Sequence, residues 1–290
     1  MKKFFNLLTN LTIIAGILII SYPVISQIYY NYQTKQEVKD FDSSAQKLTS
    51  EDVTERIKLA TAYNRSLQNL TVTDPYTKEE NAKGQAEYAR MLTVHEKIGR
   101  ISIPKIDVDL PIYAGSSEEV LQKGVGHLEG TSLPIGGQNT HTVLTAHTGL
   151  PNNRLFTDLD KMKVGDKFFI QNIAETLAYE VDSITVIEPT QFDSLNIVPD
   201  KDYVTLLTCT PYMINSHRLL VRGHRIPYKP SEEKVKNPIS HISIPPLYLV
   251  VFAILFLIFI ILASHIIFCH KTCKVIHKVS SILIILNTSF

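Results

Sequence analysis

The pattern of apolar residues predicts helices between the apolar N-terminus of the chain and residue 97. Residues 35–70 contain no glycine or proline, and their apolar positions recur at roughly helical spacing, so we expect one or two helices there. Ser50 is the expected N-cap of one of them, because acidic residues follow it in the first turn. A turn signal at 71–76 separates this region from a further predicted helical stretch over 78–92.

From Lys97 onward the pattern changes to the short apolar runs that are typical of β-strands. The run His141–His147 predicts a buried strand that ends in a loop. Several short runs follow, separated by turn signals, which favours a closed, mainly β barrel over a parallel α/β sheet. The strands predicted after His147 are 167–171, 177–181, 183–187, 203–207 and 218–222.

Two long uncharged stretches predict membrane spans near the two ends of the chain. Phe4–Ile28 and Ile242–Phe268 contain no Asp, Glu, Lys or Arg, and about 20 apolar residues suffice to cross a bilayer. Basic residues flank each stretch on the side of the nearer terminus, so we expect both termini in the cytoplasm and residues of roughly 30–240 outside. A cleaved signal peptide is the alternative for the first stretch, although that stretch is long and no A-x-A pattern follows it.

Composition narrows the functions open to the chain. The 29 basic and 28 acidic residues nearly balance, which argues against a nucleic-acid binder. The glycines between Gly124 and Gly137 lack the G-x-G-x-x-G register of a dinucleotide-binding loop. A length of 290 residues is ample to bury a core.

Cys209 is the only cysteine of the expected globular part, because Cys269 and Cys273 follow the second apolar stretch. It ends one predicted strand, and Arg218 begins the next one after a turn-like segment. Two strands joined by a loop can bring a thiol and a guanidinium to one point, and a fixed cation beside a thiol activates a nucleophilic cysteine. The sequence therefore predicts a reactive thiol at this hairpin.

A nucleophilic cysteine also needs an acid or base, and His147 is the best candidate among the ten histidines. It stands at the end of an apolar strand before a loop, where catalytic groups commonly sit. His141 shares its strand parity but lies about 20 Å back along an extended chain. The weaker candidates precede the strands, lie in a glycine-rich loop, flank the Arg218 strand, or fall at or beyond the second apolar stretch: His95, His127, His217, His224, His241, His265, His270 and His277.

The residues alone leave other interpretations open. Cys209 could be a small buried apolar side chain, and Arg218 could be an ion-paired surface residue. A zinc site of Cys209 and His147 with His217 or His141 is a further alternative, but it lacks the usual ligand spacing. No metal and no organic cofactor is implied. A non-catalytic, membrane-tethered barrel that binds a partner or a metal is the alternative from another functional class.

Three separated motifs resemble one enzyme family. TLLTC at 205–209, followed by TPYMINSHRLLVRG, resembles the TLxTC signature and following strand of sortases, the membrane-anchored cysteine transpeptidases of Gram-positive bacteria. GHLEGTSLPIGGQNTHTVLTAHTGLP at 126–151 resembles their histidine-bearing region. Asp74-Pro75-Tyr76 resembles the lid motif of class C sortases, which polymerise pilins, and the C-terminal apolar stretch resembles their second membrane span.

The resemblance implies roles for individual residues. Cys209 would be the nucleophile, His147 its acid–base partner, and Arg218 the group that stabilises the oxyanion or the substrate. Asp74 would pair with Arg218, and Tyr76 would cover the sulfur of Cys209 as part of the lid. The expected fold is mainly β: a closed sortase-type barrel of about eight strands with an N-terminal helical and lid segment and two flanking transmembrane helices.

The resemblance also implies a reaction and a domain organisation. The expected enzyme cleaves an LPxTG-like sorting signal after threonine, forms a thioester and transfers it to a pilin lysine amine. Its partners would be pilin or surface proteins that bear such signals, and the alternative within the family is a sortase that anchors surface proteins to peptidoglycan. The expected segments are a cytoplasmic stub and span (1–30), an extracellular helical region (31–95) with the lid (74–76), the barrel (96–230), a linker (231–241), a second span (242–268) and a basic cytoplasmic tail (269–290).

Overall fold

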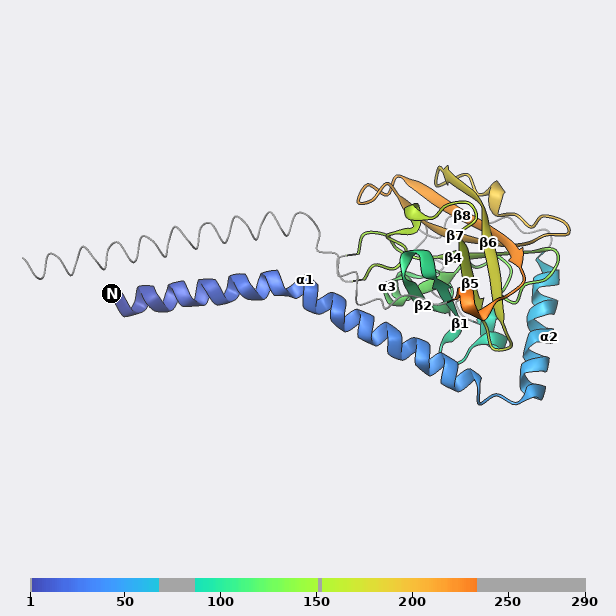
Figure 1. The fold of residues 1–290 in the computed structure, drawn as a ribbon, viewed down its shortest axis with the longest axis horizontal. Helices are drawn as coiled ribbons and strands as arrows, with labels where there is room; N and C mark the ends of the chain where they lie inside the picture. The colour runs from blue at the N-terminus through green and yellow to red at the C-terminus, as the bar shows by residue number, and fades with distance from the viewer. Residues whose placement is uncertain (1, 68–86, 151–152, 234–290) are drawn as a thin grey trace, which may run out of the picture. The chain divides into compact units, whose positions relative to one another are not determined.

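A computed structural model describes residues 2–67, 87–150 and 153–233 of the chain (Figure 1). Residues Ser26–His241 form a compact unit. Within the described residues, eight strands close into a barrel in the order β1-β2-β3-β4-β7-β8-β6-β5, which confirms the predicted mainly β barrel. The strands are β1 (Lys97–Ile103), β2 (Val108–Ala114), β3 (Val125–His127), β4 (Thr140–Thr145), β5 (Lys167–Gln171), β6 (Thr176–Ile187), β7 (Asp202–Thr210) and β8 (His217–Ile226).

The barrel mixes parallel and antiparallel pairs. β4 runs parallel to β7, with Thr145 level with Leu207, and β7 runs antiparallel to β8. β6 is one continuous strand over the two runs that the sequence separates at Asp182, because its register against β8 shifts between Val181 and Ser183. A bulge of this kind accommodates an extra residue without ending the strand.

Alternating side chains of the strands point into and out of the barrel. Leu144, Leu206 and Val221 belong to the large buried cluster that fills the interior. Their neighbours Val143, Leu207 and Leu220 form a second cluster on the outer face, where they pack against Phe192 and Leu195 from the β6–β7 connection. The outer face of β4, β7 and β8 is thus partly covered by apolar side chains.

The C-terminal end of the first helix packs against the barrel. The helix α1 (Lys2–Ala45) runs without a break past residue 30, and Phe41 of its last turns is fully buried. Lys97 of β1 is only 2% exposed, and its Nζ lies 2.8 Å from carboxylate oxygens of both Glu37 and Asp40. Because a buried ammonium requires charged partners, these two contacts fix the end of α1 on the barrel.

The helix α2 (Ser50–Ser66) follows α1 after a short turn and lies along the barrel (Figure 1). Its N-cap is Thr49, whose Oγ1 accepts a hydrogen bond from the backbone N–H of Asp52 at 3.1 Å, so the expected cap at Ser50 is wrong by one residue. Buried Asn64 donates from Nδ2 to the carbonyl of Leu133 and accepts at Oδ1 from its N–H. This paired contact holds α2 against the loop before β4.

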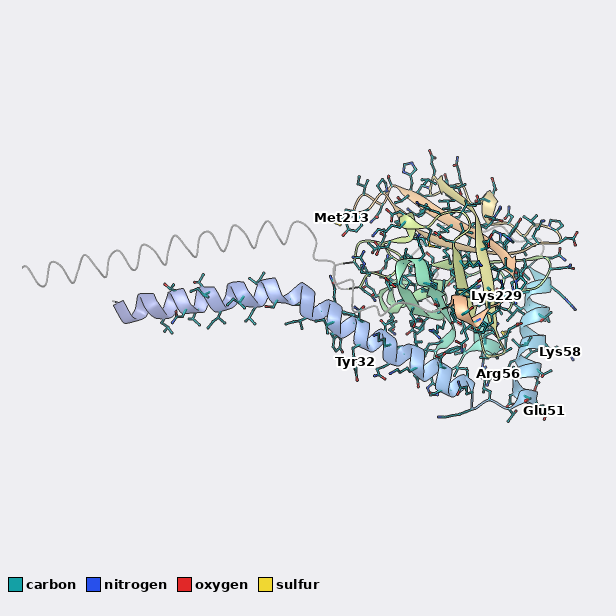
Figure 2. The ribbon with its side chains drawn as sticks, viewed as in Figure 1. Tyr32, Glu51, Arg56, Lys58, Met213 and Lys229 are labelled. Atoms are coloured by element: carbon teal, nitrogen blue, oxygen red, sulfur yellow. The ribbon has the colours of Figure 1, made fainter. Side chains whose placement is uncertain are left out.

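The last predicted helical stretch, 78–92, is described only from residue 87 onward. Its described part is a 3₁₀-helix, η2 (Glu87–Leu92), and Leu92 is fully buried. Arg56 of α2 donates from Nη1 to the carbonyl of Thr93, which directly follows η2. Figure 2 shows Arg56 on α2.

No helix among the described residues is both long enough and apolar enough to cross a membrane. The second expected span, Ile242–Phe268, and the tail that follows lie outside the described residues, as does most of the expected linker at 231–241.

Candidate active site

Cys209 and Arg218 face each other across two neighbouring strands. In the antiparallel register of β7 and β8, Cys209 lies directly opposite Arg218. Opposed residues of an antiparallel pair project to the same face, with Cβ atoms about 5 Å apart. The predicted thiol–guanidinium pair is therefore present, and it is fixed by the strand ladder rather than by a flexible loop.

His147 reaches the same place from the other side of β7. β4 ends at Thr145, which is level with Leu207, and the parallel alignment continues because Ala146 N donates to the carbonyl of Leu207 at 3.2 Å. Thr208 Oγ1 then donates to the carbonyl of Ala146 at 2.7 Å. The ladder itself ends at Thr145, and extending its register by two residues predicts that His147 lies level with Cys209.

On this register His147 after β4, Cys209 on β7 and Arg218 on β8 form one row, which we call the catalytic row after the roles that the resemblance to sortases predicts for them. The three strands are neighbours in the barrel. Cys209 and Arg218 lie two residues along their strands from Leu207 and Leu220, respectively. The side chains of Leu207 and Leu220 point outward into the second apolar cluster. By strand alternation the catalytic row therefore lies on the outer face of the barrel, beyond the end of that cluster.

Arg218 is held by the loop that it follows. The residue is 5% exposed, and its Nη1 donates to the carbonyls of Asn215 and His217, both at 3.2 Å. A guanidinium carries five N–H donors in a rigid fork, so these two bonds orient the remaining donors. The loop itself is exposed at its tip, where Met213 is 71% exposed (Figure 2).

The His147 ring is largely shielded and has an acidic partner. Its side chain is 17% exposed, and its Nε2 lies 3.2 Å and 3.3 Å from the two carboxylate oxygens of Glu118. Glu118 is the first residue of the short helix α3 (Glu118–Lys123) between β2 and β3. Sequence reasoning missed Glu118, since an acidic residue in the first turn of a helix is ordinary capping chemistry and only barrel closure brings it to the end of β4.

The two buried strand histidines, His127 and His141, are structural. The Nε2 of His127 lies 2.8 Å from the carbonyl of Ser132, while Nδ1 and Nε2 of His141 contact the carbonyl of Asn196 and Oγ1 of Thr205 at 3.0 Å and 2.8 Å. Burial lowers the pKa of each imidazole to about 4. Both rings are therefore neutral hydrogen-bonding groups at physiological pH, away from the catalytic row.

The alternative zinc site finds no support in the described part of the chain. No group of three or more His, Cys, Asp or Glu side chains is arranged there to hold a metal. Both ring nitrogens of His141 are engaged by Asn196 and Thr205, and His217 is exposed with its Nδ1 2.8 Å from Ser216 Oγ. The expected lid residues Asp74, Pro75 and Tyr76 lie outside the described residues.

What this arrangement can do follows from its parts. A half-buried thiol, a fixed guanidinium and an imidazole in one row supply a nucleophile, an anion-stabilising donor and a proton carrier. This set suits acyl transfer through a thioester.

Comparison with known proteins places this geometry in a family. Residues 101–226 match the family model described as a sortase domain. Sortase C-1 from Streptococcus pneumoniae is 64% identical, with a TM-score of 0.65, over 67% of this chain and 100% of that one. A structure described as a pilus-related sortase C of Group B Streptococcus is 62% identical, with a TM-score of 0.63, over 66% of this chain and 98% of that one.

More distant relatives match the barrel region. Sortase A of Bacillus anthracis is 31% identical over 128 residues, which is 43% of this chain and 58% of that protein. Sortase A of Streptococcus agalactiae is 30% identical over 116 residues, or 47% of its length, so the match spans about half of each of these two proteins. The extent and identity of the structural matches, with the catalytic row that the barrel assembles, show that the chain belongs to the sortase family, class C.

Proposed function

We propose that this chain is a cysteine transpeptidase that joins pilin subunits through a thioester intermediate. The observation that carries the proposal is that Cys209 lies opposite Arg218 in the strand register, while the β4–β7 register, extended by two residues, brings His147 to its other side. The row needs no cofactor for this chemistry, because the three side chains supply the nucleophile, the proton carrier and the anion stabiliser.

In the acylation step, the Cys209 thiolate attacks the carbonyl carbon of threonine in an LPxTG-like sorting signal. The carbon–sulfur bond forms, and Arg218 donates hydrogen bonds to the oxyanion of the tetrahedral intermediate. The imidazolium of His147 gives its proton to the nitrogen of the departing residue as the carbon–nitrogen bond breaks. The products are a thioester on Cys209, a free amine on the released peptide and a neutral His147.

In the second step, a neutral lysine amine of another pilin attacks the thioester carbonyl. His147 accepts a proton from the attacking nitrogen, and Cys209 departs as a thiolate, which restores the starting pair. An isopeptide bond now joins the two subunits. Arg218 stabilises the second oxyanion as it does the first, since both form at the same carbonyl.

The identity of the acceptor separates this proposal from anchoring to peptidoglycan. One of the solved relatives is described as pilus-related, which favours a pilin lysine. The test offers the enzyme a sorting-signal peptide with two acceptors, a purified pilin and a short cell-wall-type peptide amine. We expect covalent pilin ladders that the Cys209→Ala variant does not form; transfer to the short amine alone would favour anchoring.

The proposed location is the outer surface of the cell membrane, with two spans and both termini in the cytoplasm. The uncharged stretches at 4–28 and 242–268, each with a basic flank toward its terminus, support this arrangement. An impermeant thiol reagent tests it in intact cells. A cysteine placed at exposed Lys163 should react at once, whereas Cys269 and Cys273 should react only after permeabilisation.

The lid stays a prediction from the motif Asp74-Pro75-Tyr76. In the proposed arrangement, Asp74 pairs with Arg218 and the Tyr76 ring lies over the Cys209 sulfur, which would block the sorting signal until the segment moves. The stated roles follow from the resemblance to class C sortases, and removal of either side chain tests them.

A further inference from the structure

The residue that faces His147 from outside the catalytic row is Glu118. The two carboxylate oxygens lie 3.2 Å and 3.3 Å from His147 Nε2. Glu118 is separated from His147 by 29 positions in the sequence and comes from the connection between β2 and β3. The contact is therefore made by the tertiary fold alone.

Glu118 is itself held in place by its short helix. Gln122 Nε2 donates to Glu118 Oε1 at 2.6 Å, and the Ser117 side chain caps the helix by accepting from the N–H of Val120. Just before the helix, Ser116 donates from its backbone N and its Oγ to the carboxylate of Glu129, at 3.2 Å and 2.8 Å. The carboxylate is thus presented to His147 by an anchored backbone, with one oxygen already oriented.

This contact decides which ring nitrogen carries the proton. An ionised carboxylate only accepts hydrogen bonds, so the imidazole nitrogen that faces it must donate. In a neutral ring the proton then sits on Nε2, and Nδ1 keeps the lone pair that can take a proton from a thiol or an amine. We propose that Glu118 is a positioning residue of this enzyme, which fixes the tautomer and orientation of His147.

The role is one of orientation more than of electrostatic energy. The Glu118 side chain is 69% exposed, and exposed ion pairs contribute little to stability because water screens them. Fixing the ring matters in both chemical steps, since His147 must exchange a proton with two different nitrogens at defined positions. The inference rests on the proposed acid–base role of His147.

The neighbouring residue Glu119 offers a matched control. It stands in the same turn of α3 and carries the same charge, but its carboxylate pairs with Lys123 at 2.9 Å instead of His147. Glu118→Ala and Glu119→Ala therefore remove the same charge and the same helix-start carboxylate, and they differ in the contact with His147.

The test combines kinetics with a direct reading of the tautomer on the full-length chain in detergent micelles. For Glu118→Ala we expect kcat about fivefold lower, the fold-change that corresponds to an exposed ion pair at the upper end of its range, with KM for the amine unchanged. Glu119→Ala should retain the kcat of the unmodified enzyme. In two-bond ¹H–¹⁵N spectra at about pH 9, where imidazoles are neutral, His147 should show protonated Nε2, and the Glu118→Ala variant should show a mixture of tautomers.

Three results would overturn the proposal. If both variants lose kcat equally, the effect is one of general charge; if Glu118→Ala raises only KM for the amine, Glu118 binds the acceptor and does not position His147. An unchanged His147 tautomer in Glu118→Ala would also contradict it. The spectra need no turnover, so they test the role of Glu118 even if the proposed transpeptidation is wrong. That failure would appear separately, because the unmodified enzyme would then form no pilin ladders.

Discussion

Cys209 and Arg218 lie directly opposite each other on β7 and β8, so the proposed nucleophile and its cation are positioned by the same strand ladder. Arg218 is also bound to the two carbonyls of Asn215 and His217. The backbone of Arg218 is fixed by the strand, and its guanidinium is fixed by the two carbonyls, so the guanidinium stays in place when the thiol moves. The pair is therefore preorganised to stabilise an oxyanion at a fixed place. Such donors need no reorganisation when the negative charge develops in the transition state.

Replacement of Arg218 by lysine should be severe although it keeps the charge. The ammonium lacks the planar fork that binds Asn215 and His217 while presenting further donors, so we expect kcat to fall about a hundredfold. Arg222→Lys is the matched control on the same strand, where Arg222 pairs with Asp182 and stacks over Tyr203. Steady-state transpeptidation rates should separate the two variants, and an equal, small loss in both would remove Arg218 from the site.

His147 and His141 share a strand direction but should respond differently to replacement. His147→Gln removes the proposed proton carrier, and we expect turnover to fall by at least a hundredfold with little change in unfolding temperature. His141→Asn breaks the contacts with Asn196 and Thr205, so it should lower the free energy of unfolding by about 1–3 kcal/mol while the folded fraction keeps its kcat. Activity per folded molecule, measured beside thermal unfolding, distinguishes the two.

Stability should decrease in mildly acidic solution because of the buried histidines. Burial lowers the pKa of His127 and His141 from 6.5 to about 4, so the unfolded chain binds more protons than the folded one between these values. The free energy of unfolding should therefore fall as pH decreases from about 6.5 to 4, by about 3 kcal/mol for each imidazole.

The His141→Asn variant isolates this effect. Its urea-unfolding free energy should depend less steeply on pH than that of the unmodified chain, by about 1.4 kcal/mol per pH unit in the same window. Contributions from carboxylates are common to both proteins and cancel in the difference. Parallel pH profiles of the two proteins would show that His141 is not buried in its neutral form.

Local sequence patterns predict β5, β7, β8 and the pairing of Cys209 with Arg218. The run 167–171 coincides with β5, and the turn between Cys209 and Arg218 correctly indicated a hairpin that juxtaposes them. Hairpin neighbours are close in sequence, so their contact is readable from spacing alone. His147 was identified as the best base from its place at a strand end, and its alignment with Cys209 depends on the parallel pairing of β4 and β7.

Contacts that depend on barrel closure were not readable from the sequence. Glu118 meets His147 only after the connection between β2 and β3 is folded against β4, and Asn64 finds Leu133 across 69 positions. The bulge in β6 merges two predicted strands, since the residue between them, Asp182, looks like a break but pairs with Arg222. Each case involves a polar residue whose partner is distant in the chain.

The lid can be tested through the reactivity of Cys209. In Asp74→Ala or Tyr76→Ala, we expect a thiol reagent to label Cys209 several times faster, because the proposed cover over the sulfur is removed. Labelling of Cys269 and Cys273 is subtracted with the Cys209→Ala variant. Equal rates in the unmodified and variant chains would mean that neither side chain restricts access to the thiol.

Intact-mass analysis of the acylated enzyme tests the central claim most directly. The full-length chain is mixed with a sorting-signal peptide in the absence of an amine acceptor and is quenched with acid. We expect the mass to increase by that of the peptide portion ending at threonine, with the adduct on Cys209 and its loss on addition of a lysine-bearing pilin. An enzyme that cleaves the peptide without such an adduct, or an adduct that persists in Cys209→Ala, would contradict the thioester mechanism.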